Sequence, residues 1–131
     1  MKVITATGKR KSAIARATLK AGSGKITINN TQLENFQPAI AQLRIKEPLI
    51  LAGAHADKVD IAVSVHGGGF MGQTAATRLA IAKVLAEKYD KLKSVFLDYD
   101  RQLLVADVRR KEVRKPNTRG KARAKRQKSY R

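Results

Sequence analysis

Apolar and polar residues alternate along the first part of the chain, which predicts β-strands. We expect a short strand over residues 2–7 and a second strand over residues 11–20 (KSAIARATLK). The second strand has an apolar face and a basic outer face: Ala13, Ala15, Ala17 and Leu19 against Ser12, Ile14, Arg16, Thr18 and Lys20. Turn residues at 21–24 (AGSG) precede residues 25–29, where Ile26 and Ile28 resume the alternation. The pattern predicts a hairpin of these two strands.

The middle of the chain predicts a short helix and then a strand. Pro38 suits the first turn of a helix through residues 38–46. Pro48 should end that helix, because proline disfavours helix in the residue before it. Residues 59–67 (VDIAVSVHG) alternate strictly, with these residues on one side: Val59, Ile61, Val63 and Val65. This is the clearest strand pattern in the sequence.

Residues 72–91 have the spacing of a helix of about five turns. One face is apolar (Ala75, Leu79, Ala82, Leu85, Ala86, Tyr89) and the other is charged (Lys83, Glu87, Asp90, Lys91). Residues 93–103 fit either a helix or a strand. The expected element order is three strands, helix, strand, helix and tail.

The last 18 residues have a composition that cannot form a core. Residues 114–131 hold nine Lys or Arg and no Asp or Glu, and only Ala122, Ala124 and Tyr130 could enter a core. Ordering such a segment costs roughly 1 to 2 kcal/mol per residue in backbone entropy, with little apolar area to offset it. We therefore expect a globular domain over residues 1–103 and an extended basic tail over residues 104–131. The tail either is solvated or folds against a polyanion.

The charge favours a nucleic-acid partner. Of the 28 basic and 10 acidic side chains, residues 104–131 carry 12 and 2, so the formal charge of +18 is densest in the tail. No apolar run approaches the roughly 20 residues that span a bilayer, and the N-terminus has no apolar signal segment, so we expect a cytoplasmic protein with no membrane partner. There is no cysteine, and His55 and His66 are isolated. We expect no metal, no cofactor and no catalysis.

A glycine motif offers an enzymatic alternative. Gly67, Gly69 and Gly72 spell G-x-G-x-x-G between the predicted strand and helix, as in dinucleotide-binding domains. The candidate ribose-binding acid, Asp98, lies 26 residues after Gly72, beyond the usual spacing of about 20, and too few apolar residues follow for a doubly wound sheet. The same loop can bind RNA phosphate at a helix N-terminus or serve only as a tight turn. Arg78 in the following helix could extend to water or reach a phosphate near the loop.

Three stretches of the sequence resemble one family. They are ATGKRKSAIARATL at 6–19, VHGGGFMGQTAATRLAIAKVL at 65–85 and KARAKRQKSYR at 121–131. Together, and in this order, they resemble the small-subunit ribosomal protein nine family across nearly the whole chain. The ending Ser-Tyr-Arg is similar to that of its archaeal and eukaryotic branch.

The resemblance implies a fold and a role. The fold is α+β, a two-layer sandwich of the ribosomal-protein-five second-domain type (three strands, helix, strand, helix) with a left-handed crossover and an extended basic C-terminal tail. The role is that of a structural constituent of the small ribosomal subunit. Its body would bind ribosomal RNA in the head, beside neighbouring head proteins, and its tail would reach peptidyl-site transfer RNA. The rival binding function is that of a histone-like DNA-compacting protein.

The resemblance also implies individual contacts. Ribosomal RNA binding falls on residues that match the family's motifs: Lys9, Arg10, Lys11, Gly67, Gly68, Gly69, Gln73, Arg78, Arg119, Lys121, Arg123, Lys125 and Arg126. Transfer-RNA contact falls on the end of the tail: Lys128, Ser129, Tyr130 and Arg131. Pro116 and Asn117 replace the glycine-containing approach that is usual in the family, so the path of residues 113–120 is not implied.

Overall fold

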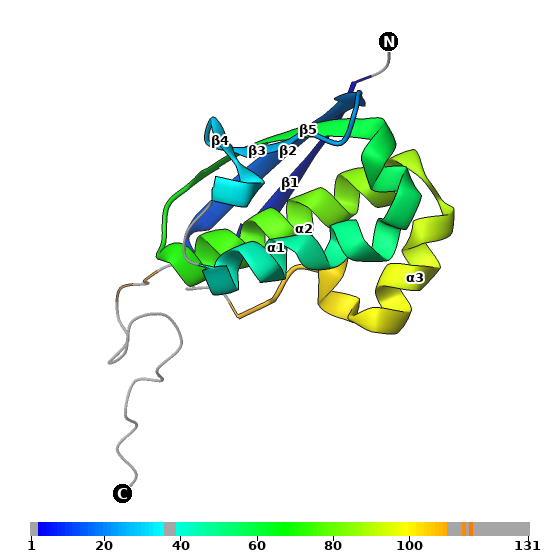
Figure 1. The fold of residues 1–131 in the computed structure, drawn as a ribbon. Helices are drawn as coiled ribbons and strands as arrows, with labels where there is room; N and C mark the ends of the chain where they lie inside the picture. The colour runs from blue at the N-terminus through cyan, green and yellow to red at the C-terminus, as the bar shows by residue number, and fades with distance from the viewer. Residues whose placement is uncertain (1–2, 36–38, 110–113, 115, 117–131) are drawn as a thin grey trace, which may run out of the picture.

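Helices cover one face of a five-stranded sheet in the computed structural model, which describes residues 3–35, 39–109, 114 and 116 (Figure 1). The strands lie in the order β1-β2-β5-β3-β4. Their bounds are β1 Ile4–Arg10, β2 Ala13–Ala21, β3 Ile26–Ile28, β4 Thr31–Gln32 and β5 Val59–His66. All neighbouring strands are antiparallel except β3 and β5, which are parallel. The described residues thus confirm a mixed α+β fold.

The helical layer contains three α-helices and three short 3-10 helices among the described residues. The α-helices are α1 Ala39–Ala52, α2 Phe70–Lys88 and α3 Lys91–Tyr99. The 3-10 helices are η1 Leu33–Asn35, η2 Gly53–Lys58 and η3 Arg101–Leu103. Helix α2 packs against β1, β2 and β5, and α1 packs against α2 from the other side. Residues 93–103, which fitted two patterns, are therefore mainly helical.

The alternation that predicted strands is confirmed in β2 and β5. In β2 the small apolar residues from Ala13 to Leu19 are buried at every second position, and Arg16 and Lys20 are exposed. In β5 Val59, Ile61, Val63 and Val65 are all buried. The buried faces meet α2, so the sheet contributes the apolar floor of the core.

The predicted hairpin between residues 11–20 and 25–29 is wrong. Strand β5 lies between β2 and β3, and it pairs with both of them. The backbone at residues 21–25 bonds to β5, because the N–H groups of Gly22 and Gly24 donate to the carbonyls of Lys58 and Val59. Strand β5, which has the clearest alternation in the sequence, therefore takes the central position, where both of its edges are paired.

The helix predicted to stop at Pro48 continues to Ala52. Proline inside a helix removes one backbone hydrogen bond and costs about 3 kcal/mol. Here Ile45, Pro48 and Ala52 are all buried on the face toward the rest of the helical layer. Burial of this apolar surface outweighs the local cost.

Helix α2 is more deeply buried than its predicted single apolar face implies. Residues 76–82 are all buried, including Arg78, because the sheet covers one side of α2 and the other helical elements cover the opposite side. Lys83 is only partly exposed, and Glu87 is exposed at the end of the helix. A helix rich in alanine suits this central place because it allows close approach on both sides.

Candidate nucleic-acid interface

The turn between β1 and β2 carries three consecutive cations. Lys9 and Arg10 end β1, and Lys11 lies in the turn with a left-handed φ of 54°. A side chain other than glycine in that conformation costs roughly 1 to 2 kcal/mol. The tight turn between antiparallel β1 and β2 requires such a conformation, and it holds the three cations together at one end of the sheet.

The glycine loop after β5 lies directly against this turn. Gly67 and Gly68 have left-handed φ values of 81° and 66°. A Cβ on Gly67 would overlap the backbone carbonyl oxygen of Ser12, and one on Gly68 would lie 3.3 Å from the Cβ of Ala13. Gln73 fixes the loop from the helix side, since its Nε2 donates to the carbonyl of Gly67 at 3.1 Å. The pairing of β2 with β5 thus brings together two motifs that lie more than 50 residues apart in the sequence.

The first turn of α2 opens to the outside beside the loop. Gly69 is the N-cap residue, and no side chain caps this helix end in the described part of the chain. A Cβ on Gly69 would meet nothing within 4 Å, and Phe70 and Met71 are exposed. The backbone N–H groups of this turn carry the positive end of the helix dipole and can bind an anion.

A cavity of about 310 Å³ opens between the turn, α1, the start of α2 and the segment after η3; we call it the basic cleft. Its lining includes six cationic side chains and one carboxylate, that of Asp107. The cations are Lys9, Arg10, Lys11, Arg44, Arg78 and Arg109. The lining is therefore strongly positive, as a phosphate-binding surface should be.

Arg78 lies on the inner wall of the basic cleft and faces carboxylates within the protein. Only 5% of the residue is exposed. Its Nε donates to Glu47 Oε2 at 2.9 Å, and its Nη2 donates to the same oxygen and to Asp100 Oδ2 at 3.2 Å. The pKa of Asp100 lies below its usual value, mainly because the backbone N–H of Gln102 donates a hydrogen bond to its carboxylate. The hydrogen bond from Arg78 lowers this pKa further. The guanidinium therefore ties α1 and the start of η3 to α2 through its Nε and Nη2.

Asp107 joins the segment after η3 to the β1–β2 turn. Its carboxylate accepts hydrogen bonds from the backbone N–H of Arg109 at 2.8 Å and from the Arg109 guanidinium at 2.7 Å. Nη2 of Arg10 lies 3.7 Å from the same carboxylate. The hydrogen bonds from Arg109, with the charge of Arg10, hold the pKa of Asp107 far below its usual value. Nη1 of Arg10 is buried and finds no hydrogen-bond partner within residues 3–35, 39–109, 114 and 116.

Three charged residues of the basic cleft were missed by sequence reasoning. Asp107 and Arg109 are two residues apart, so their pairing could have been read from their opposite charges. Arg44 could not have been predicted from the sequence, because its place in the cleft depends on how α1 packs against α2. The predicted residues Lys9, Arg10, Lys11, Gly67, Gly68, Gly69 and Gln73 lie together at one end of the domain.

We predict that Asp107→Asn releases the segment that follows η3. An amide cannot form the ion pairs with Arg10 and Arg109, so exchange of the Arg109 backbone amide should become about tenfold faster. Because the pKa of Asp107 is lowered in the folded protein, its contribution is present above the ordinary value of 3.8 and is lost only as the pH falls well below it. Wild-type protection should therefore persist at pH 4. The measurement is amide exchange followed by NMR.

The matched control for this prediction is Asp98→Asn, which removes the same charge from an exposed position on α3. It should leave the exchange of Arg109 unchanged. Equal exchange rates at Arg109 in wild type and Asp107→Asn would show that the carboxylate does not hold this segment.

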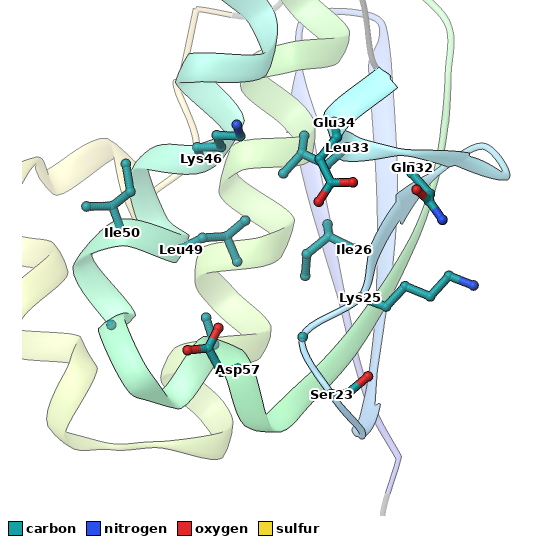
Figure 2. Close-up of a pocket in the computed structure, with 13 residues that line it drawn as sticks. Ser23, Lys25, Ile26, Gln32, Leu33, Glu34, Lys46, Leu49, Ile50 and Asp57 are labelled. Atoms are coloured by element: carbon teal, nitrogen blue, oxygen red, sulfur yellow. The ribbon is translucent and has the colours of Figure 1, made fainter.

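A second cavity, of about 470 Å³, lies elsewhere, between β3, η1, α1 and η2. Figure 2 shows Ile26 and Leu49 on opposite walls of this cavity, with the Lys25 ammonium directed away from it. Its charged lining residues are two lysines and two acids: Lys25, Lys46, Glu34 and Asp57. This balance gives the cavity no preference for an anion.

The structure gives the glycine motif a setting unlike that of a dinucleotide-binding domain. The strand before the loop has antiparallel β2 on one side, and the sheet is mainly antiparallel. Asp98 lies exposed in α3, and no strand follows α2 in residues 39–109. No second strand therefore presents Asp98 to a ribose, as the fingerprint requires.

The described residues offer no site for a metal ion and no helix that could cross a membrane. No group of three or more His, Asp or Glu side chains there could hold a metal ion. None of the helices in this part of the chain has the length and apolar content that crossing a membrane requires. The predicted contacts of the tail, from Arg119 to Arg131, lie outside the described residues.

The chain is similar to a known family along almost its whole length. The family model described as Ribosomal protein S9/S16 matches residues 8–131. The chain is 51% identical over 134 residues to the small ribosomal subunit protein uS9 of Methanococcus maripaludis strain C7, with all of both chains covered. Proteins of the same name from Methanothrix thermoacetophila and Methanococcus vannielii are 50% and 49% identical, again with complete coverage. The match includes both motifs of the interface and the basic tail.

Proposed function

The chain belongs to the ribosomal protein S9/S16 family, and from this premise we propose that it binds ribosomal RNA through the β1–β2 turn, the glycine loop and the basic cleft. Family membership gives it a structural role in the small subunit of the cytoplasmic ribosome, and its archaeal relatives agree with the branch inferred from the Ser-Tyr-Arg ending. We further propose that the domain sits in the subunit head with the fold type that the resemblance implies.

The observation that carries the proposal is the meeting of cations and free backbone N–H groups at one end of the domain. Lys9 and Lys11 lie beside Gly67–Gly69 and the uncapped start of α2. Side-chain cations and helix N-termini are both groups that proteins use to hold nucleic-acid phosphates. Arg78 lines the same cleft, where Glu47 and Asp100 hold its Nε and Nη2.

We also propose that the tail contacts RNA away from the domain. A segment of 18 residues spans at most about 60 Å when extended. The basic residues from Arg119 to Arg126 would follow the ribosomal RNA, and Lys128, Ser129, Tyr130 and Arg131 would reach peptidyl-site transfer RNA. Arginine can pair with phosphates and stack on bases, which suits a segment without a core of its own.

We predict that replacing Lys9, Arg10 and Lys11 together by alanine impairs assembly into the small subunit. Loss of three cations should weaken binding to small-subunit RNA by about 10- to 100-fold, because each charge-assisted phosphate contact is worth about 1.5 to 3 kcal/mol and neighbouring contacts share the load. The measurement is an RNA titration of the purified protein together with the protein content of isolated subunits.

The matched control replaces three exposed lysines at the far end of the helical layer: Lys88, Lys91 and Lys93. Helix α2 has 19 residues and is therefore about 28 Å long, so these lysines lie far from the glycine loop. This control should bind and assemble nearly as wild type does. Equal loss in both triple variants would mean that total charge, not the interface, determines binding.

We predict that deleting residues 128–131 weakens transfer-RNA binding without blocking assembly. The domain keeps its own RNA-binding surface, so the shortened protein should still enter subunits. Those subunits should hold peptidyl-site transfer RNA up to about tenfold more weakly, most visibly at raised salt, because the lost contacts are largely electrostatic. The measurement is a titration of transfer RNA on purified subunits at several salt concentrations. Equal affinity at every salt would assign the terminal residues another role.

A further inference from the structure

The face of the sheet turned away from the helices is uncovered in the described part of the chain, as Figure 1 shows. We call it the open sheet face. Its side chains alternate with the buried ones on each strand. They are Thr5, Thr7 and Lys9 of β1, Ile14, Arg16, Thr18 and Lys20 of β2, Thr27 of β3, and Asp60, Ala62, Ser64 and His66 of β5.

Short side chains form a trough across the middle of this face. The strand register sets Thr18 opposite Ala62, and Ala62 opposite Thr27, so β2, β5 and β3 each contribute a small residue to one row. Two adjoining hollows of about 310 and 400 Å³ lie along this row, and both are lined by these same three residues. The trough is therefore continuous across three strands.

Cations flank the trough and have no carboxylate partner among the described residues. Arg16, Lys20 and Lys25 line the two hollows, and they take part in no ion pair there. The carboxylate on this face is that of Asp60, whose Oδ1 accepts the backbone N–H groups of Ser23 and Lys25 at 3.0 and 2.9 Å. Asp60 is thus engaged in holding a turn, and the face keeps a positive charge.

The composition of the face selects among possible partners. Its strands carry no Phe, Tyr or Trp, and their one imidazole, that of His66, lies at the end of β5, so the face lacks the row of stacking side chains that single-stranded RNA requires. Its one large apolar residue is the half-buried Ile14, so it lacks the apolar core of a protein–protein interface. Hydroxyl groups and cations remain. These suit the 2′-hydroxyls and phosphates that double-helical RNA displays along its shallow minor groove.

We propose that the open sheet face binds the backbone of double-helical RNA. This inference rests on the proposed function, because it assumes an RNA-binding subunit protein, but it adds a second surface, which shares only Lys9 with the basic cleft. Arg16 and Lys20 are four residues apart on β2, which places them about 13 Å apart along one side of the trough. The hydroxyls of Thr7, Thr18 and Ser64 can each donate one hydrogen bond and accept others.

The proposal is tested by removing the flanking charges. The variant is Arg16→Gln, Lys20→Gln and Lys25→Gln in the full chain, and the matched control is Lys88→Gln, Lys91→Gln and Lys93→Gln. The probe is a perfectly paired RNA hairpin, titrated from low to physiological salt. The face variant should lose at least about tenfold in affinity. Its slope of log affinity against log salt should become shallower by about 0.9 for each lost contact. The control should lose less than about threefold.

A second variant removes hydroxyls without changing charge. Thr7→Val and Thr18→Val keep the shape of the side chains and their preference for strands. The double variant should bind the RNA hairpin about three- to tenfold more weakly than wild type. Its affinity for a DNA hairpin of the same sequence should be unchanged, because DNA lacks the 2′-hydroxyl. A thermal unfolding measurement on every variant checks that the domain remains folded.

The outcomes separate this inference from the proposed function. If the face variants bind like the control while replacement of Lys9, Arg10 and Lys11 weakens binding, the open sheet face is not an RNA site and the proposed function stands. If the wild-type protein itself fails to bind RNA, the proposed function and the inference about the open sheet face are both contradicted. If the face variants bind RNA normally but are missing from purified subunits, the face contacts a protein, and our inference is overturned.

Discussion

Replacing Gly8 by alanine should lower the free energy of unfolding by about 3 kcal/mol or more. Gly8 lies in the middle of β1, where the strand crosses α2. A Cβ at this position would overlap the backbone carbonyl oxygen of Ala76 and lie 2.8 Å from the amide nitrogen of Ala80. Both atoms belong to the backbone of α2, so no side chain can turn aside to make room. The strand and the helix would have to move apart.

The effect of Gly8→Ala should reach the interface as well. Gly8 immediately precedes the Lys9–Lys11 turn, and that turn meets the glycine loop through the contact between Ser12 and Gly67. Displacement of β1 would therefore separate the cations from the start of α2. RNA affinity should fall even under conditions where most of the protein remains folded.

Urea denaturation of wild type and variant measures the stability change. The control is Gly69→Ala, since a Cβ there meets nothing within 4 Å and its φ of −93° suits any residue. That substitution should cost at most about 1 kcal/mol, the difference between glycine and alanine at an N-cap. A Gly8→Ala variant within about 0.5 kcal/mol of wild type would contradict the close packing of β1 on α2.

The sequence predicted which side of β2 and β5 is buried, but not which strands are neighbours. Alternation in β2 and β5 reports the face toward the core, because that face alone must be apolar. Pairing depends on contacts far apart in sequence. The hairpin predicted from the AGSG turn failed because backbone groups at residues 21–25 bond to β5 instead of closing onto β2.

The helix predictions were limited by tertiary packing. Local preference ended the first helix at Pro48, but burial of Ile45, Pro48 and Ala52 extends it. A single apolar face was expected for α2, whereas α2 is covered on two sides. The alanines of α2 are the residues that allow close approach on both sides. Short strand β4 carried no readable pattern, since it has only two exposed residues.

The candidate site was partly predictable. The cations at residues 9–11 and the glycines at 67–69 were both singled out, but their proximity comes from the pairing of β1 with β2 and of β2 with β5. Arg78 was expected to extend to water or reach a phosphate. Its carboxylate partners lie 31 and 22 residues away in sequence, so no local pattern could reveal them.

The ion pairs of Arg78 join three parts of the helical layer. Glu47 belongs to α1, Arg78 to α2, and Asp100 is the N-cap residue of η3. The side chains of Glu47 and Asp100 are 29% and 39% exposed, so water partly screens them, whereas that of Arg78 is 6% exposed. The arginine is consequently the member whose removal matters most. Removal of Arg78 leaves the carboxylates of Glu47 and Asp100 close together with no cation between them.

We predict that Arg78→Met lowers the free energy of unfolding by about 3 kcal/mol at pH 7, near the lower limit for breaking a buried ion pair because its partners are partly solvated. Methionine keeps most of the side-chain volume, so the loss reports charge and hydrogen bonding more than a cavity. Arg78→Lys should lose less stability, since it keeps the charge but not the planar fork.

The pKa of Asp100 is lowered in the folded protein, so the stability that its carboxylate contributes is complete above the ordinary pKa of 3.8 and is lost as the pH falls below it. Urea denaturation should therefore show a large difference in the free energy of unfolding between wild type and Arg78→Met at pH 7. This difference should become smaller below pH 4. A difference that is independent of pH would mean that Arg78 stabilises the domain by packing, not by pairing with Asp100.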